Sequence, residues 1–238
     1  LKENFNTIDD YMKSHSIKLF IDYDFFPLTL KEMLVPIDPM MPFYDKIQNI
    51  PLTEVKNYVK IAVHWRRIDE IITLKQTGLE LIDINPTDVS FGLKANTNLI
   101  SALCHLAEYP SMIKRLLTSY SLPNEYGFYS VKLYVNGLLT EIILDGLIPC
   151  FPKSFPIYIN STSEKANWAI LLEKAFAKIF KSYDKVKTKP ISIIYKMLTG
   201  FPVKHIIVKS SEENLEQIST ELEGYIKQNY IISCYSDS

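Results

Sequence analysis

Residues 168–178 read Trp-Ala-Ile-Leu-Leu-Glu-Lys-Ala-Phe-Ala-Lys and carry the strongest fold signal in the chain. Apolar side chains recur here every three or four residues, which is the spacing of one face of an α-helix. The sequence predicts a helix over 161–183 with Ser163 as its N-terminal cap, because a serine oxygen accepts hydrogen bonds from the first backbone N–H groups. The residues expected on the apolar face are Trp168, Leu171, Leu172, Ala175, Phe176 and Ile179.

The residues that precede this helix predict a β-hairpin. Asn136-Gly137 separates two apolar stretches, 126–134 and 139–145. Asparagine and glycine both tolerate the positive φ angles that a two-residue type I′ turn requires. We therefore expect antiparallel strands on either side of this pair.

A second long helix is expected over 96–117, with Asn96 as its cap and Pro110 as a break. Prolines between 27 and 51 interrupt any helical period, so residues 1–60 are expected to form an irregular approach to a core over 61–238. The remaining expected elements are a short helix at 67–72, strands at 79–84, 203–208 and 230–234, and a helix at 211–228 with Leu215, Ile218, Leu222 and Ile226 facing inward.

Composition bounds the class of protein. The chain has 238 residues, which fit one domain or two small lobes, and 47% of them are hydrophobic. A net charge of −1 favours neither nucleic acid nor a polybasic membrane anchor as a partner, and no apolar run approaches the roughly 18 residues that span a bilayer. Three widely spaced cysteines are typical of a reducing, intracellular compartment. The absence of an initial methionine leads us to expect an internal piece of a longer chain.

Several segments, in order, resemble the calpain family of cysteine proteases. Residues 168–178 are similar to the family's Trp-x-x-Leu-Leu-Glu-Lys-Ala-Tyr-Ala-Lys. Residues 91–103, Phe-Gly-Leu-Lys-Ala-Asn-Thr-Asn-Leu-Ile-Ser-Ala-Leu, resemble its active-site segment Gln-Gly-x-x-Gly-Asp-Cys-Trp-Leu-Leu-Ala-Ala. The resemblance covers about 20–234 and implies an α+β fold, the first half of a calpain/papain-like protease core, with helices packed on a small antiparallel sheet. The other similar segments are 20–27, 63–71, 126–137, 143–149, 198–200 and 232–234.

The same alignment implies that the catalytic positions have changed. Thr97 occupies the position of the nucleophilic cysteine, Phe91 that of the oxyanion-stabilising glutamine, and Asn98 that of the following tryptophan. A threonine hydroxyl does not ionise near neutral pH as a thiol does. The family's histidine and asparagine lie beyond Ser238, so the sequence predicts a calpain-like domain that is not an enzyme.

One alternative is an active calcium-dependent cysteine protease whose nucleophile is Cys104, displaced from the aligned position. Cys104 and His105 are adjacent in the expected helix, so their side chains point about 100° apart. Cys104 also lies well inside the helix, away from the positive end of its dipole. We prefer the interpretation of Cys104 as a packed cysteine beside a boundary histidine.

A second alternative is a calcium-responsive regulatory lobe. The resemblance implies a calcium site with two acidic ligands, and Asp88 matches one of them, whereas Ala166 occupies the position of the other. Calcium takes six to eight oxygen ligands, so the loss of a carboxylate weakens such a site. We expect no cofactor, and we expect Asp88 to be a cap or turn residue.

Lys181, Lys185, Lys187 and Lys189 form a basic cluster that could meet an acidic protein surface such as that of tubulin. The alternative, which we prefer from sequence, is a solvated run of lysines. The expected function is a structural or protein-interaction module, without catalysis, in a larger intracellular assembly of cytoskeletal or ciliary type. Its expected partners are proteins rather than nucleic acids or membranes.

Overall fold

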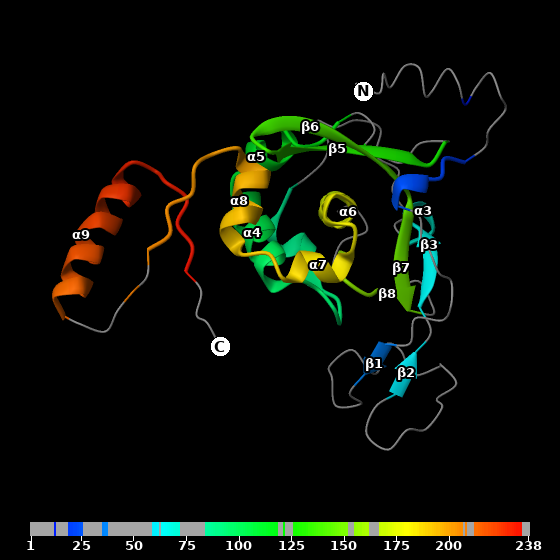
Figure 1. Cartoon of the computed structure of the whole chain (residues 1–238), viewed down its shortest axis with the longest axis horizontal. Helices are drawn as coiled ribbons and strands as arrows, with labels where there is room; N and C mark the ends of the chain where they lie inside the picture. Colours follow the sequence, from blue (N-terminus) through cyan, green and yellow to red (C-terminus); the bar gives the residue numbers. More distant parts are fainter. Residues whose placement is uncertain are drawn as a thin grey trace. The chain divides into compact units, whose positions relative to one another are not determined.

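The computed structural model describes residues 12, 19–25, 35–37, 59–61, 63–71, 84–118, 121, 126–151, 155–161, 167–206, 208 and 212–234 (Figure 1). The chain forms two compact units, Leu1–Pro202 and Val203–Ser238. The strands are β1 Val35–Ile37, β2 Val59–Ile61, β3 His64–Arg67, β4 Val89–Phe91, β5 Phe128–Val135, β6 Leu138–Asp145, β7 Leu147–Phe151, β8 Phe155–Pro156 and β9 Ile159–Ser161. The helices are η1 Tyr23–Phe25, α3 Ile68–Ile71, η3 Pro86–Asp88, α4 Thr97–Ala107, α5 Pro110–Lys114, α6 Trp168–Phe180, α7 Tyr183–Lys187, α8 Ile191–Thr199 and α9 Glu212–Lys227.

Helix α6 forms the centre of the first unit. All ten residues of 168–177 are buried, and the helix packs against α7, β5, β6 and β9 (Figure 1). The prediction of a single apolar face was therefore too narrow. A helix that is buried on all sides has to satisfy every polar side chain that it carries, so the positions of Glu173 and Lys174 require specific partners.

The predicted bounds of this helix were too wide at both ends. Ser161 closes β9, and Asn167 is the residue that caps α6, while Ser163 lies outside the described residues. At the other end Lys181 adopts a left-handed conformation with φ 60°, which stops the helix before α7 begins at Tyr183.

The predicted hairpin is confirmed. Strands β5 and β6 pair along their whole length, from Val135 opposite Leu138 to Phe128 opposite Asp145. Asn136 has φ 51° and Gly137 has φ 80°, as a type I′ turn requires.

Three further small sheets are antiparallel: β3-β7-β8, β4-β9 and β1-β2. Together with the helices they confirm the predicted α+β class. The short helix predicted at 67–72 is α3, although Arg67 belongs to β3. The strand predicted at 79–84 lies almost wholly outside the described residues, and Ile84 belongs to no strand.

The predicted helix over 96–117 is confirmed as two helices, α4 and α5. Asn96 caps α4, because its Oδ1 accepts the N–H groups of Asn98 at 3.0 Å and Leu99 at 3.3 Å. Pro110 begins α5, so the proline separates the two helices as expected.

The second unit contains the predicted C-terminal helix as α9, but its inward face is only partly formed. Ile218 is buried, whereas Leu215 is 45% exposed and Ile226 is 63% exposed. The strands predicted at 203–208 and 230–234 are wrong, since the described residues there are not in strands. Apolar residues form a strand only when another strand pairs with their backbone, and none of the described residues of this unit does so.

No helix in the described part of the chain combines the length and the apolar character that crossing a bilayer demands.

Candidate functional site

Residues 91–98, the segment that resembles the family's active-site segment, pack against β9, the strand before α6. Strand β4 pairs with β9, with Phe91 opposite Ile159. A Cβ atom on Gly92 would lie 1.9 Å from the carbonyl oxygen of Tyr158, so only glycine fits there. The Lys94 N–H donates to the Ile157 carbonyl at 2.9 Å, which fixes the turn that leads into α4.

The start of α4 is held from the other side by α7. The buried Asn96 amide donates to the Val186 carbonyl at 2.7 Å. The Asn98 amide donates to the Lys189 carbonyl at 3.2 Å. Thr97 lies between these two anchors, exposed, as the first residue of the helix. Its hydroxyl is therefore carried at the positive end of the helix dipole, where an anion would be stabilised.

Thr97, Phe91 and Asn98 lie at the end of β4 and in the first turn of α4. Phe91 ends β4 and is 47% exposed, and its side chain has no hydrogen-bond donor. His105 lies further along α4, and its Nδ1 is 2.9 Å from the hydroxyl of Tyr195. The segment thus places Thr97 at the first residue of α4 and Phe91 at the end of β4.

Cys104 is held in a packed position on α4. It is half-buried, and its thiol lies 3.6 Å from the Pro86 carbonyl oxygen, to which it donates. Burial raises the pKa of this thiol, which lowers its thiolate fraction near neutral pH. These contacts favour the interpretation of Cys104 as a packed cysteine.

Asp88 serves as a cap. The backbone N–H of Asn85 donates to its Oδ2 at 3.2 Å, while the Asn85 side chain accepts from the Thr87 N–H at 3.0 Å. Ala166, which occupies the position of the second acidic ligand implied by the resemblance, lies outside the described residues. Within those residues, no cluster of three or more His, Cys, Asp and Glu side chains is suited to a metal ion. Among the described residues, the Asp88 carboxylate is engaged by the backbone of Asn85, as expected of a cap.

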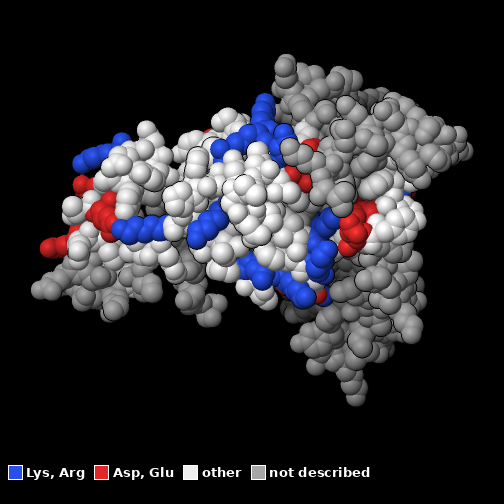
Figure 2. Space-filling view, turned by 45° about the horizontal axis from the view of Figure 1, so that its top comes forward, with Lys and Arg blue, Asp and Glu red and all other residues white. Residues whose placement is uncertain are grey.

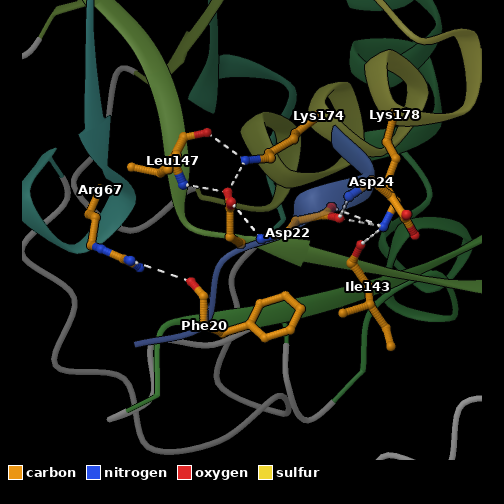
Figure 3. A network of polar contacts seen from close by, with 9 residues as sticks. Phe20, Asp22, Asp24, Arg67, Ile143, Leu147, Lys174 and Lys178 are labelled. Atoms are coloured by element: carbon orange, nitrogen blue, oxygen red, sulfur yellow. Dashed lines mark hydrogen bonds and ion pairs between the residues drawn. The ribbon is translucent and has the colours of Figure 1, made fainter. Parts of the chain in front are cut away.

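A buried polar network joins α6 to the N-terminal segment, and the sequence did not reveal it (Figure 3). Lys174 forms an ion pair with Asp145, both fully buried, and also donates to the Leu147 carbonyl at 2.6 Å. Asp145 accepts the N–H of Asp22 at 3.0 Å and that of Leu147 at 2.9 Å. Lys178 contacts the Asp22 carboxylate at 2.9 Å. The only signal in the sequence was a pair of lysines four residues apart in an apolar helix.

This network fixes the position of a segment that is distant in sequence. Lys178 also donates to the Ile143 carbonyl at 2.8 Å, and the Asp24 N–H donates to Asp22 at 3.2 Å (Figure 3). Arg67 donates from Nη2 to the carbonyl of Phe20 at 3.4 Å. Residues 19–25 are thus tied to α6, to β6 and to the end of β3.

Glu173 holds the strand against which the candidate site packs. It is 3% exposed, and its Oε2 accepts the N–H of Ile159 at 2.8 Å. Burial raises the pKa of Glu173 to about 8, although this hydrogen bond and the charge of Lys187 oppose the shift. The carboxyl group therefore holds β9, against which the Phe91 strand pairs.

We predict that Glu173 makes stability depend on pH. Between the ordinary pKa of 4.5 and the folded value of about 8, the folded chain keeps a proton that the unfolded chain releases. The free energy of unfolding therefore falls by about 2–4 kcal/mol as pH rises through this window. Glu173→Gln should flatten this part of the profile, as measured by urea unfolding from about pH 5 to about pH 9. Parallel profiles for the two proteins would contradict the assignment.

The predicted lysine cluster borders the same site. Lys181, Lys185 and Lys187 are exposed, and Lys189 is half-buried. The ammonium group of Lys187 lies 5.8 Å from the centre of the Tyr158 ring, and that of Lys189 lies 4.6 Å from the centre of the Phe180 ring.

Comparison with known proteins agrees with this architecture. The calpain family cysteine proteases match residues 38–238. The calpain-type cysteine protease DEK1 of Arabidopsis thaliana is 25% identical over 191 residues, which cover 78% of this chain and 9% of that protein. Calpain-9 of Homo sapiens is 23% identical over 181 residues, covering 75% of this chain and 25% of that protein. The calpain-1 catalytic subunit of Macaca fascicularis is 24% identical over 159 residues, covering 66% and 22%. The chain thus spans a quarter or less of the length of these relatives. It belongs to the calpain family of cysteine proteases.

Proposed function

We propose that this chain is a non-catalytic calpain-family domain that serves as a protein-interaction module in a larger intracellular assembly, of cytoskeletal or ciliary type. The observation that supports the loss of catalysis most directly is the position of Thr97 at the first residue of α4. A thiol placed there would ionise readily, because the helix dipole stabilises its anion. The same dipole cannot bring a threonine hydroxyl into the range of neutral pH.

The neighbours of Thr97 support the same proposal. Phe91 has no donor with which to stabilise an oxyanion, and the amide of Asn98 is engaged by the Lys189 carbonyl. An oxyanion donor contributes about 3–4 kcal/mol to acyl transfer, so its loss alone is a large handicap. Nucleophile, donor and tryptophan positions have changed together, while Gly92 and Asn96 still build the turn and cap around them.

The combination of retained packing features with altered active-site positions supports a binding role. The buried network of Lys174, Asp145, Asp22 and Lys178 and the glycine contact at position 92 are specific and costly features. Gly92 holds the backbone that leads to Thr97, and the network holds α6, β6 and residues 19–25 together. Several relatives are named as calpain-type cysteine proteases, and that activity belongs to them.

We predict that Thr97→Cys will create a reactive thiol without creating a protease. The new thiol should react with iodoacetamide at least about tenfold faster at pH 7 than Cys104, because it lies at a helix N-terminus. A fluorogenic peptide should still not be hydrolysed. Labelling of single-cysteine variants, followed by mass spectrometry, measures the rates at which iodoacetamide reacts with the thiol at position 97 and with that of Cys104. Hydrolysis by the unmodified protein that is lost in Cys104→Ala would instead establish the displaced nucleophile.

The interaction half of the proposal needs its own test. Cross-linking mass spectrometry on the native protein from extract should give reproducible cross-links between this chain and one protein partner. A stable monomer that repeatedly purifies without a partner would contradict an interaction role, whatever the result of the protease assay.

A further inference from the structure

Lys94 precedes α4, Lys185 and Lys187 lie on α7, which packs against α4, and Lys181 and Lys189 flank α7. We call these five residues the lysine face. Three of them are exposed, while Lys94 and Lys189 are half-buried. The whole chain has a net charge of −1, so a basic surface of this kind reflects segregation of charge rather than composition. Figure 2 shows one face of the molecule, where basic side chains, with some acidic ones beside them, lie around a broad uncharged area.

Contacts place Lys94 and Lys187 close together. Lys187 lies over the ring of Tyr158, and the backbone of Lys94 is bonded to Ile157, the residue before that tyrosine. Burial lowers the pKa of Lys187, the Asp184 carboxylate opposes this shift, and the charge of Lys94 adds to it. The two ammonium groups therefore lie within electrostatic reach of each other.

Lys189 is held next to the start of α4, where Thr97 lies. The Asn98 amide holds the Lys189 carbonyl, and the Lys189 ammonium group lies over the ring of Phe180, next to Lys181. A lysine that stacks on an aromatic ring is restricted in its motion, so less conformational entropy is lost when it binds an anion. The lysine face is thus partly preorganised.

Two carboxyl groups, those of Asp184 and Glu173, act electrostatically on Lys187 in the lysine face. Within the described ranges, no ion pair of 4.0 Å or less joins any of these lysines to a carboxylate. Asp184 accepts from the Tyr158 hydroxyl at 3.4 Å, and the buried Glu173 accepts from the Ile159 N–H. Mutual repulsion among clustered ammonium groups costs free energy, which a bound anion relieves.

We propose that the lysine face binds an acidic segment of a partner protein, laid across the exposed start of α4. This inference rests on the proposed role as an interaction module and names its surface and the chemistry of its partner. Charge complementarity supports it, together with the neutral hydroxyl of Thr97 beside the lysines, which can donate to a carboxylate or a backbone carbonyl. An extended acidic segment can contact cations on three different elements at once.

The test is peptide binding by fluorescence anisotropy on the full chain. The probe is a fluorescein-labelled peptide of four Glu-Glu-Gly repeats, and Gln-Gln-Gly repeats serve as the uncharged comparison. We expect the acidic peptide alone to bind, and about tenfold weaker binding when NaCl rises from roughly 50 to 300 mM. Lys94→Glu/Lys187→Glu should weaken binding by at least about tenfold, whereas Lys114→Glu/Lys196→Glu, with the same charge change at exposed positions, should weaken it less than about twofold.

Three outcomes would overturn the inference: no binding of the acidic peptide, equal loss in both double variants, or tighter binding to phosphatidylserine vesicles or single-stranded RNA than to the peptide. Each of these outcomes can be told apart from a failure of the proposed function itself. Cross-links from a native partner to a different surface would retain the interaction module and discard the lysine face. Peptide hydrolysis would discard the loss of catalysis and leave the binding result standing.

Discussion

Lys174→Met will lower the free energy of unfolding by about 3–5 kcal/mol, because it leaves the Asp145 carboxylate buried without its cation. Asp145 is fully buried, and the Leu147 carbonyl also loses the donor that lies 2.6 Å away. Methionine fills a similar volume, so the loss reports the charge rather than a cavity. Urea unfolding at pH 7, followed by circular dichroism, measures the effect.

Asp145→Asn is the matched substitution, because it removes the negative partner of the Lys174–Asp145 ion pair. It removes the negative charge that opposes the effect of burial on Lys174, so the pKa of Lys174 falls further below its ordinary value. The unfolded chain then binds more protons than the folded one, and the variant should gain stability as pH rises. A loss of less than about 1 kcal/mol in Lys174→Met would contradict the buried ion pair.

Gly92→Ala will destabilise the chain by about 2–4 kcal/mol, because an added methyl group has no room. Its Cβ would lie 1.9 Å from the Tyr158 carbonyl oxygen and 2.5 Å from that of Ile157, and both are backbone atoms that cannot rotate away. The β4–β9 pair must therefore separate. Amide exchange should increase at Phe91 and Ile159, which face each other across this pair.

Gly224→Ala is the control for this prediction. Gly224 lies within α9, and an added Cβ would meet no atom within 4 Å apart from its chain neighbours and the backbone of its own helix. Alanine is the better helix former by about 1 kcal/mol, so this variant should be neutral or slightly stabilised. Equal destabilisation by the two substitutions would refute the close approach at Gly92.

The elements that the sequence predicted correctly depend on local chemistry. The Asn136-Gly137 turn and the Asn96 cap follow from the conformational preferences of a few adjacent residues. The strands predicted at 203–208 and 230–234 failed because strand formation depends on a distant pairing partner. The side chain of Lys204 instead forms an ion pair with Glu221 and donates to Tyr225 at 3.0 Å.

The candidate site shows the same division. Thr97, Phe91 and Asn98 are close in sequence, so a single segment places them together. Glu173 on α6 accepts a hydrogen bond from Ile159 on β9. The helical periodicity of the sequence did not predict this contact, because it joins two different elements. The buried network was missed for the same reason, since Asp22 and Lys178 come from opposite ends of the first unit.

The most direct test of the central claim is hydrolysis of unfolded casein by the natural full-length protein, with and without calcium. The account predicts that cleavage will not exceed that of a Thr97→Ala variant under either condition. Cleavage by the natural protein that disappears in Thr97→Ala, or in Cys104→Ala, would show that the domain is a working protease and would contradict the account.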